Sequence, residues 1–140
     1  MGRALNDTGG RRDFLLDSCA LLWAAKKPSG LGSSARGIIE DPATRLFLSS
    51  ISAYEVAFKH RLGKLGEYGF IAENYTEVVR KLGTIDLPIT LAHAYFAGQM
   101  AWPHRDPFDR IIAAQAALEN LILITNDTAL CHHPQLETVW

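Results

Sequence analysis

The chain has 140 residues, of which 48% are hydrophobic, so it falls in the usual size range of a single globular domain with a sizeable core. Its 14 Lys and Arg residues nearly balance its 15 Asp and Glu residues, which leaves a formal net charge of -1. This balance excludes a broad basic surface of the kind that coats nucleic acid without specificity. It leaves open a nuclease whose bound metal ions supply the positive charge.

The cysteines and the first residues of the chain favour a cytoplasmic protein. Cys19 and Cys131 lie far apart and form no disulfide pattern, which indicates a reducing compartment. Residues 1–12 contain no apolar segment typical of a signal peptide or a membrane span. We therefore expect residues 1–12 to be a flexible N-terminal extension outside the fold, and residues 13–140 to form one domain.

Short apolar runs alternate with longer segments of helical spacing from residue 13 onward, a pattern typical of α/β proteins with a parallel sheet. Strands are predicted at residues 14–16, 46–48, 84–87 and 121–125, with an edge strand at 137–140. Helices are predicted at residues 18–25, 33–40, 71–82 and 91–100, from Ser50 or Ser52 to about residue 65, from Asp106-Pro107 to residue 119, and briefly after Asp127. The expected fold is a central parallel sheet of four to five strands flanked by helices.

Two aspartates follow two of the predicted strands. Asp17 ends the first apolar run, and Asp127 comes soon after the run at residues 121–125. In open parallel sheets, ligands bind beyond the carboxyl ends of the strands. Aspartates also commonly stop strands and cap helices, so either residue alone has a structural explanation. Their occurrence after two central strands favours a functional site.

Glu55 lies on the apolar face of its predicted helix. Ile51, Phe58 and Leu62 mark this face, and position 55 falls on it one turn after Ile51. Burial of an unpaired ionised carboxylate costs more than a small domain can sustain, so Glu55 requires a cation. Two kinds of cation remain open, a metal ion or the side chain of Lys59 or an arginine in a partly buried salt bridge.

Asp106 and Asp109 lie at the start of the helix that ends near residue 119. Asp106 is expected at the N-cap and Pro107 at the first helical position, where both residue types are favoured. Asp109 lies in the first turn, where a negative charge already gains from the helix dipole. Because this helix is apolar nearly all round, its N-terminus is expected to dock on the rim of the sheet. Asp109 would then face the same crevice as Asp17 and Asp127.

Four carboxylates, those of Asp17, Glu55, Asp109 and Asp127, are thus predicted to share one crevice. They repel one another strongly unless hard divalent cations lie among them. Ligation by oxygen alone suits Mg²⁺ or Mn²⁺, which also bind substrate phosphates. Such a site hydrolyses phosphodiester bonds, so the sequence predicts a metal-dependent nuclease.

Several neighbouring side chains are weaker candidates. Ser18 and Thr125 adjoin the acidic residues and could hold a metal-bound water, although both also suit a turn. Arg110 and His104 flank Asp109 and are candidate phosphate contacts.

Two further clusters have simpler interpretations. The basic residues near the end of the Glu55 helix either contact RNA phosphates or form a solvated face; they are Lys59, His60, Arg61 and Lys64. Cys131-His132-His133 has no second ligand pair with zinc spacing, and adjacent side chains diverge, so we interpret this cluster as structural.

The segments that carry the acidic residues resemble the PIN domain, and most closely the VapC-type toxins of bacterial toxin–antitoxin modules. These segments are FLLDSCALLW at residues 14–23, SAYE at 52–55, HRDPFDRIIAAQA at 104–116 and TND at 125–127. The resemblance covers essentially all of residues 13–140, and the segment around Asp109 is its most specific part.

The resemblance implies a parallel sheet flanked by helices, Mg²⁺-dependent endoribonuclease activity on RNA, frequent homodimers and a cognate antitoxin protein. By position, Asp17, Glu55, Asp109 and Asp127 match the acidic residues of the family. Asp106 matches an additional acidic position of the VapC-type subgroup.

Two other classes of metal-binding α/β protein fit poorly. A phosphoacceptor receiver domain would need an acidic pair after the first strand and a lysine after a late strand, whereas Ser18 and Cys19 follow Asp17 and no lysine stands beside Asp127. A haloacid-dehalogenase-type phosphatase would need an aspartate where Cys19 stands. The remaining alternative is a catalytically inactive PIN-like binding module, which the four intact acidic positions disfavour.

Overall fold

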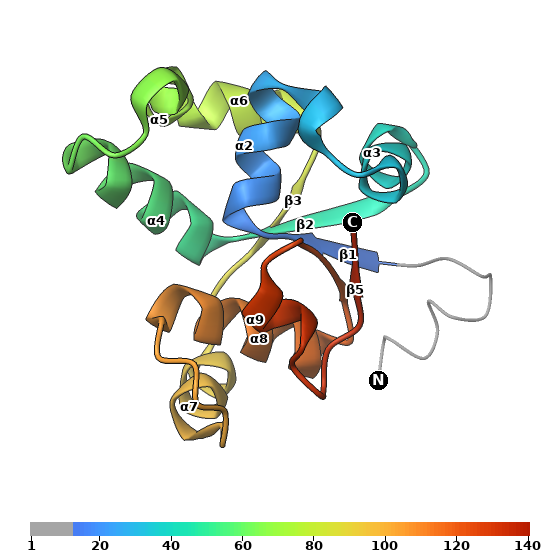
Figure 1. Cartoon of the computed structure of the whole chain (residues 1–140), viewed down its shortest axis with the longest axis vertical. Coiled ribbons are helices and arrows are strands. Elements are labelled where there is room, and N and C mark those ends of the chain that lie inside the picture. The colour runs from blue at the N-terminus through green and yellow to red at the C-terminus, as the bar shows by residue number, and fades with distance from the viewer. Residues whose placement is uncertain (1–12) are drawn as a thin grey trace.

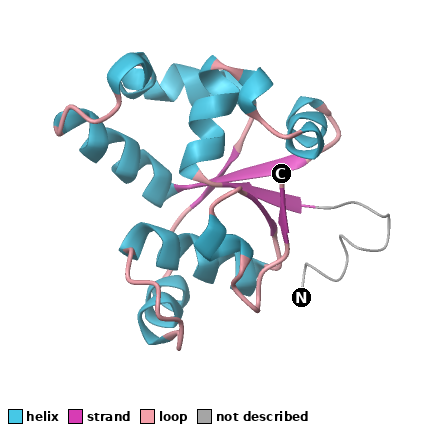
Figure 2. Ribbon diagram, in the orientation of Figure 1, coloured by secondary structure: helices cyan, strands magenta, loops and turns pink. Residues whose placement is uncertain are grey.

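A parallel five-stranded sheet lies between two layers of helices in the computed structural model, which describes residues 13–140 (Figure 1 and Figure 2). The strands are β1 (Asp13–Leu16), β2 (Arg45–Ser49), β3 (Ile85–Leu87), β4 (Ile122–Ile124) and β5 (Thr138–Val139). They lie in the order β3-β2-β1-β4-β5, and each neighbouring pair is parallel. The predicted α/β class and the edge strand are confirmed. The predicted extension, residues 1–12, lies outside the described residues.

The central strand β1 contributes to both halves of the hydrophobic core. Phe14 and Leu16 belong to the core on one face of the sheet, and Leu15 belongs to the core on the other face. Leu15 is aligned with Phe47 of β2 and with Leu123 of β4. Because helices cover both faces, β1 is buried along its whole length, which explains why its sequence shows no polar alternation.

Each face of the sheet has its own layer of helices (Figure 1). The first layer contains α2 (Ser18–Lys26), α3 (Ser33–Glu40), α4 (Ser50–Arg61), α5 (Gly69–Glu73) and α6 (Tyr75–Leu82), with the 3-10 turns η1 (Pro28–Gly30) and η2 (Gly66–Tyr68). On the other face lie α8 (Pro107–Glu119) and α9 (Thr128–Cys131), and α7 (Leu91–Gln99) packs against α8. No helix within residues 13–140 is long and apolar enough to cross a membrane.

The predicted boundaries of α4 were wrong at both ends. Its N-cap is Ser49, whose hydroxyl accepts a hydrogen bond from the Ile51 N–H at 3.1 Å, and not Ser50 or Ser52. The helix ends at Arg61, about a turn before the predicted residue 65. Gly63 adopts a φ of 73°, a left-handed conformation that glycine accepts most readily and that commonly ends helices.

The predicted helix at residues 71–82 was also wrong as a single element. The structure has two helices, α5 and α6, which are separated at Asn74. The side-chain amide of Asn74 donates to the Phe70 carbonyl at 2.8 Å, and its backbone φ of -124° is far from helical. A side chain that bonds the nearby backbone offers the chain an alternative to continuing the helix.

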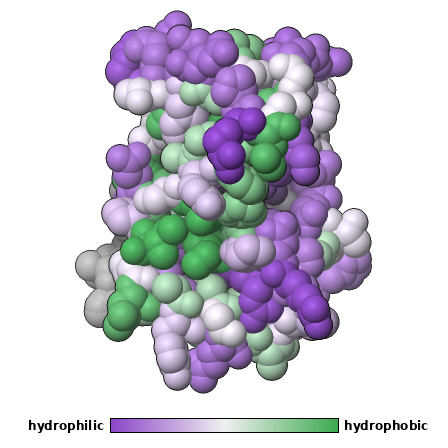
Figure 3. Space-filling model, turned by 90° about the vertical axis from the view of Figure 1, so that its left-hand side faces the viewer, coloured by the Kyte–Doolittle hydropathy of each residue, from purple (hydrophilic) through white to green (hydrophobic). Residues whose placement is uncertain are grey.

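The carboxyl ends of the strands meet at one edge of the sheet, where β1 leads into α2 and β2 leads into α4 (Figure 1). This edge lies toward the left in Figure 1, and Figure 3 shows the molecule from that side. Hydrophobic side chains form a patch there, and strongly hydrophilic side chains gather beside it (Figure 3). Polar side chains therefore gather near the sheet edge where α/β proteins usually bind ligands.

Candidate metal centre

Three aspartates from distant parts of the chain meet at the carboxyl end of the sheet. Asp17 follows β1, Asp127 follows the neighbouring strand β4, and Asp109 lies in the first turn of α8. The charges of Asp109 and Asp127 both raise the pKa of Asp17, and the charge of Asp127 raises the pKa of Asp109. The structure thus brings together three of the four predicted acidic residues.

Asp17 is the most buried member of this group, with 7% of its surface exposed. Burial raises the pKa of Asp17 to about 6, and the neighbouring carboxylates add to this effect. Hydrogen bonds from the Thr125 hydroxyl and the Ala20 N–H oppose it, because they stabilise the ionised form. In the metal-free protein, the Asp17 carboxylate is therefore only partly ionised near pH 6.

Asp17 and Asp127 are also helix caps. Asp17 accepts a hydrogen bond from the Ala20 N–H at 2.7 Å and caps α2, while Asp127 accepts one from the Leu130 N–H at 3.1 Å and caps α9. The structural role considered for strand-end aspartates is therefore real. Each cap bond uses one carboxylate oxygen, so capping and metal binding through the second oxygen are compatible.

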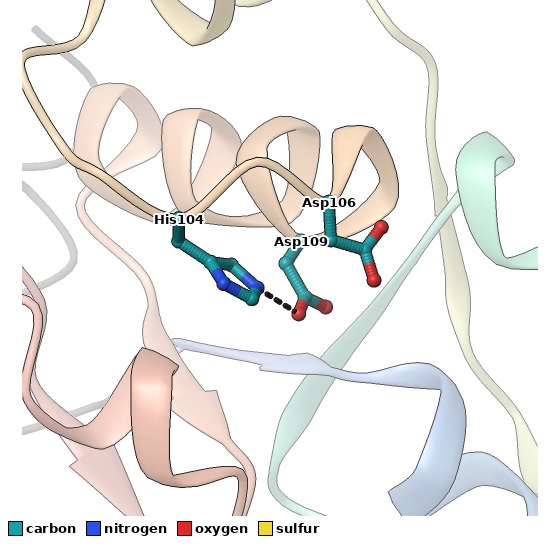
Figure 4. Close-up of side chains that lie close together, drawn as sticks. All are labelled: His104, Asp106 and Asp109. Carbon is teal, nitrogen blue, oxygen red and sulfur yellow. Dashed lines mark hydrogen bonds and ion pairs between the residues drawn. The ribbon is translucent and has the colours of Figure 1, made fainter.

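His104, Asp106 and Asp109 project from the same region at the N-terminus of α8 (Figure 4). The His104 ring nitrogen Nε2 lies 2.8 Å from Oδ2 of Asp109. Asp106 caps α8 as predicted, since its Oδ1 accepts a hydrogen bond from the Phe108 N–H at 2.9 Å. One potential ligand atom from each of the three residues falls within 4.8 Å of the others, so the group has the size of a metal site.

The pKa of Asp109 is raised, chiefly by burial. The hydrogen bond with His104 lowers the pKa, whereas the charges of Asp106 and Asp127 raise it. Asp109 therefore resembles Asp17 in that burial and neighbouring carboxylates raise its pKa, although Asp109 is less buried than Asp17. Such perturbed groups cluster at functional sites.

Glu55 points into the protein, as its position on the helix predicted, and Lys59 is its cation. Glu55 is 9% exposed, and its Oε2 lies 2.7 Å from Nζ of Lys59 one helical turn later. Of the two kinds of cation left open by the sequence, the structure contains the salt bridge. Burial is the largest single effect and lowers the pKa of Lys59, but the hydrogen bond and charge of Glu55, together with the charges of Cys19 and Asp106, raise the pKa overall.

Glu55 lies close to the aspartates, as the interactions of three neighbouring residues indicate; these residues are Lys59, Cys19 and Ser52. The charge of Lys59 interacts with Asp106 and with Cys19. Burial raises the pKa of the Cys19 thiol, as do the charges of nearby carboxylates, namely Asp17, Glu55 and Asp127. The Ser18 hydroxyl donates to the buried Ser52 hydroxyl at 3.0 Å, which ties α2 to α4 beside these groups.

Arg110 has a different role from the predicted phosphate contact. Four of its N–H donor positions point to backbone carbonyls, at distances from 2.6 to 2.9 Å; the acceptors are Ala97, Met100, Trp102 and His104. A guanidinium has five N–H donors, so little of this group remains for a phosphate. Arg110 instead fixes the loop between α7 and α8, including the backbone of His104.

The other weak candidates find local partners. Thr125 accepts a hydrogen bond from the Asp127 N–H at 3.0 Å, so it supports the turn as well as Asp17. His133 is 4% exposed and packs edge-on against the Trp102 ring at 4.6 Å. The His132 ring lies 2.9 Å from the Thr128 carbonyl, so His132 and His133 have separate surroundings, in agreement with the structural interpretation of this cluster.

Sequence reasoning underestimated His104 and Lys59. The sequence indicates only a phosphate contact for His104, because its bond to Asp109 depends on the path of the loop that Arg110 fixes. Lys59 was considered as a partner of Glu55 because of the i, i+4 spacing, but its interaction with Asp106 across two helices has no local sequence signal.

The chain matches the family model of the PIN domain over residues 14–136. Similar solved structures include DNA-bound VapBC from Salmonella typhimurium, with a TM-score of 0.69, 18% identity, and coverage of 91% of this chain and 97% of that chain. VapBC2 from Rickettsia felis bound to a promoter DNA fragment gives a TM-score of 0.65 at 18% identity, covering 91% of this chain and 98% of that chain. FitAcB from Neisseria gonorrhoeae gives 0.62 at 21% identity, covering 91% of this chain and 96% of that chain.

These structural likenesses support the same fold. No curated protein sequence matches the chain. The family model, however, spans nearly all of the described residues, from the first strand to the segment before β5. On this match, the chain belongs to the PIN domain family.

Proposed function

We propose that this chain is a Mg²⁺- or Mn²⁺-dependent endoribonuclease and the toxin of a toxin–antitoxin pair. The observation that carries the proposal is the meeting of Asp17, Asp109 and Asp127 at the carboxyl end of the sheet, with the pKa of Asp17 raised to about 6. An ionised carboxylate that is buried beside other carboxylates destabilises a protein unless a cation offsets its charge. Membership of the PIN family agrees with a nuclease.

The residues present fit a hard divalent cation. The three aspartates offer only oxygen ligands, and Mg²⁺ typically binds through one or two carboxylates, several waters and substrate phosphates. Asp17, Asp109 and Asp127 would therefore hold the ion. When bound, it supplies an activated water near neutral pH and stabilises negative charge on the phosphate.

The protein itself orients the carboxylates through hydrogen bonds before any metal ion binds. The Ala20 N–H and the Thr125 hydroxyl orient Asp17, and the Leu130 N–H orients Asp127. The His104 ring nitrogen Nε2 lies 2.8 Å from Oδ2 of Asp109 and orients this carboxylate. A rigid ligand set loses little conformational freedom when substrate arrives, which favours catalysis.

The partners follow from the same proposal. The similar solved structures include complexes named VapBC and one described as a toxin–antitoxin complex from Klebsiella pneumoniae. An antitoxin for this chain would place a basic or apolar segment in the acidic crevice, with arginine as the favoured residue because its planar group pairs with carboxylates at two points. A homodimer and a cytoplasmic location, both expected from the sequence, stay predictions.

Cleavage of a defined RNA by purified protein tests the proposal. Cleavage should require Mg²⁺ or Mn²⁺, disappear with EDTA and be absent from Asp17→Asn and Asp109→Asn. The control is Asp86→Asn, which alters an exposed aspartate on the edge strand β3. Metal-independent cleavage would contradict the mechanism. Ordered metal binding without any cleavage would instead identify a catalytically inactive PIN-like binding module.

A further inference from the structure

We infer that Lys59 acts as a permanent second cation of the metal centre, so that the centre takes one divalent ion per chain. The inference rests on the proposed function, since it concerns how the same carboxylates are neutralised. In this inference Lys59 neutralises Glu55, and the three aspartates bind the metal ion.

The first step is the contact between Lys59 and Glu55. Nζ of Lys59 lies 2.7 Å from Oε2 of Glu55, and the Glu55 side chain is only 11% exposed. A buried carboxylate that loses its single cation is strongly disfavoured, so the pair is costly to separate. A metal ion that recruited Glu55 would have to displace the ammonium group from this contact.

The second step is the position of Lys59 relative to the other carboxylates. Its charge interacts with Asp106, at the N-cap of α8, as well as with Glu55 on α4. Lys59 and Glu55 both act on the Cys19 thiol, whose pKa is also raised by the charges of Asp17 and Asp127. Lys59 therefore lies between α4 and α8, in the electrostatic field of the metal centre.

The third step is the division of the carboxylates into two sets. Burial is the largest effect on the pKa of both Asp17 and Asp109, and Asp109 is paired with the His104 ring and not with a lysine. Glu55 and Asp106 both interact with Lys59. In nucleases with two metal ions, the second ion neutralises the far side of the reacting phosphate. Here the ammonium group takes that place, and with 43% of its side chain exposed it is reachable by RNA.

Counting bound Mn²⁺ by titration, with electron paramagnetic resonance to detect free ion, tests the inference. The wild-type chain should bind one Mn²⁺. Lys59→Met should bind two, because Glu55 and Asp106 become available as ligands. Lys64→Met removes an exposed lysine just beyond α4 and should still bind one. Two Mn²⁺ ions in the wild type, or one in both the wild type and Lys59→Met, would overturn the inference.

A second variant keeps the test decisive where Lys59→Met fails to fold. The double variant Glu55→Gln/Lys59→Met removes the ion pair without leaving either charge unpaired, so it should bind one Mn²⁺ with unchanged Kd, because Glu55 is not a ligand in the wild type. A weakening of roughly 10–100-fold, typical when groups that support a metal are lost, would overturn the inference. Absence of any Mn²⁺ binding by the wild type would contradict the proposed function itself, which separates that failure from the failure of the Lys59 assignment.

Discussion

Asp17 performs two tasks that make opposite demands on its charge. As the N-cap of α2 it accepts a hydrogen bond at 2.7 Å, which favours the ionised carboxylate. Burial beside two further carboxylates favours the neutral form, and burial dominates, since the pKa rises from 3.8 to about 6. The same residue therefore stabilises a helix and weakens the metal-free fold near neutral pH.

Asp17→Asn should stabilise the metal-free protein at pH 7 by roughly 2–3 kcal/mol, because each pKa unit corresponds to about 1.4 kcal/mol. The unfolded chain releases this proton near pH 3.8, whereas the folded chain keeps it to about pH 6. The wild type therefore loses stability relative to the variant as the pH rises from about 4 to about 6, and the difference vanishes at lower pH. Asparagine keeps the cap, so the helix is unaffected.

Urea unfolding in EDTA across this pH range measures the effect. Asp86→Asn serves as the control, since Asp86 is exposed on β3. A variant that is less stable than the wild type at every pH would show that Asp17 is mainly a structural cap.

At the scale of one element, the N-terminus of α8 separates capping from catalysis. Asp106→Ser retains a side chain that can accept from the Phe108 N–H, so we expect it to keep its stability and much of its cleavage rate. Asp109→Ser should lose nearly all cleavage, because serine cannot replace a charged metal ligand. Asp106→Ala, which removes the cap, should be destabilised by about 0.5–2 kcal/mol.

Cleavage of one RNA at saturating Mg²⁺, with thermal melting of each variant, measures both effects. Equal loss of activity in Asp106→Ser and Asp109→Ser would mean that Asp106 also holds or orients the metal.

The loop between α7 and α8 depends on Arg110 in a way that lysine cannot reproduce. Arg110 donates to the carbonyls of four loop or helix-end residues, and a lysine has a single nitrogen. Arg110→Lys should therefore lower the free energy of unfolding by roughly 2–3 kcal/mol, as the loss of several charge-assisted hydrogen bonds implies. Chemical denaturation measures the change. The exposed Arg105, treated in the same way, should change stability little, and an equal effect at both positions would contradict this role.

Local signals explain which elements the sequence could predict. Asp106 and Pro107 mark the start of α8 through capping and backbone preferences that act within a few residues, and the prediction was confirmed. The end of α4 and the break at Asn74 depend on single residues whose alternative conformations compete closely with the helix. Their outcome is decided by the surrounding fold, so the periodic pattern extended the predicted α4 too far and missed the break between α5 and α6.

The site could be predicted in part for a similar reason. The positions of Asp17 and Asp127 follow from the rule that parallel strands end at a common edge. The bond of His104 to Asp109 and the interaction of Lys59 with Asp106 join a loop or a second helix to α8. Contacts of this kind depend on the three-dimensional path of the chain, for which a single sequence has no periodic signal.

On the scale of the whole molecule, α7 exposes an apolar surface that suits a second copy of the chain. Leu91 is 89% exposed, Tyr95 is 70% exposed one turn later, and Ile89 lies just before the helix. If the proposed homodimer uses this surface, Leu91→Glu should convert it to a monomer, because burial of a charge at an apolar interface is strongly disfavoured. Light scattering after size exclusion measures the mass. Leu62→Glu, at an exposed leucine after α4, is the control, and a dimer unaffected by Leu91→Glu would place the interface elsewhere.

The strand order determines when the site can form during synthesis of the chain. β1 is central in the sheet, yet one of its neighbours is β4, so the Asp17 N–H finds its partner, the Ile124 carbonyl at 3.2 Å, only after more than a hundred further residues have been added. A nascent chain that has not yet reached β4 lacks Asp127 and leaves one side of β1 open. The proposed cleavage activity can therefore arise only after synthesis has passed Asp127, because Asp17, Asp109 and Asp127 are present together only from that point on.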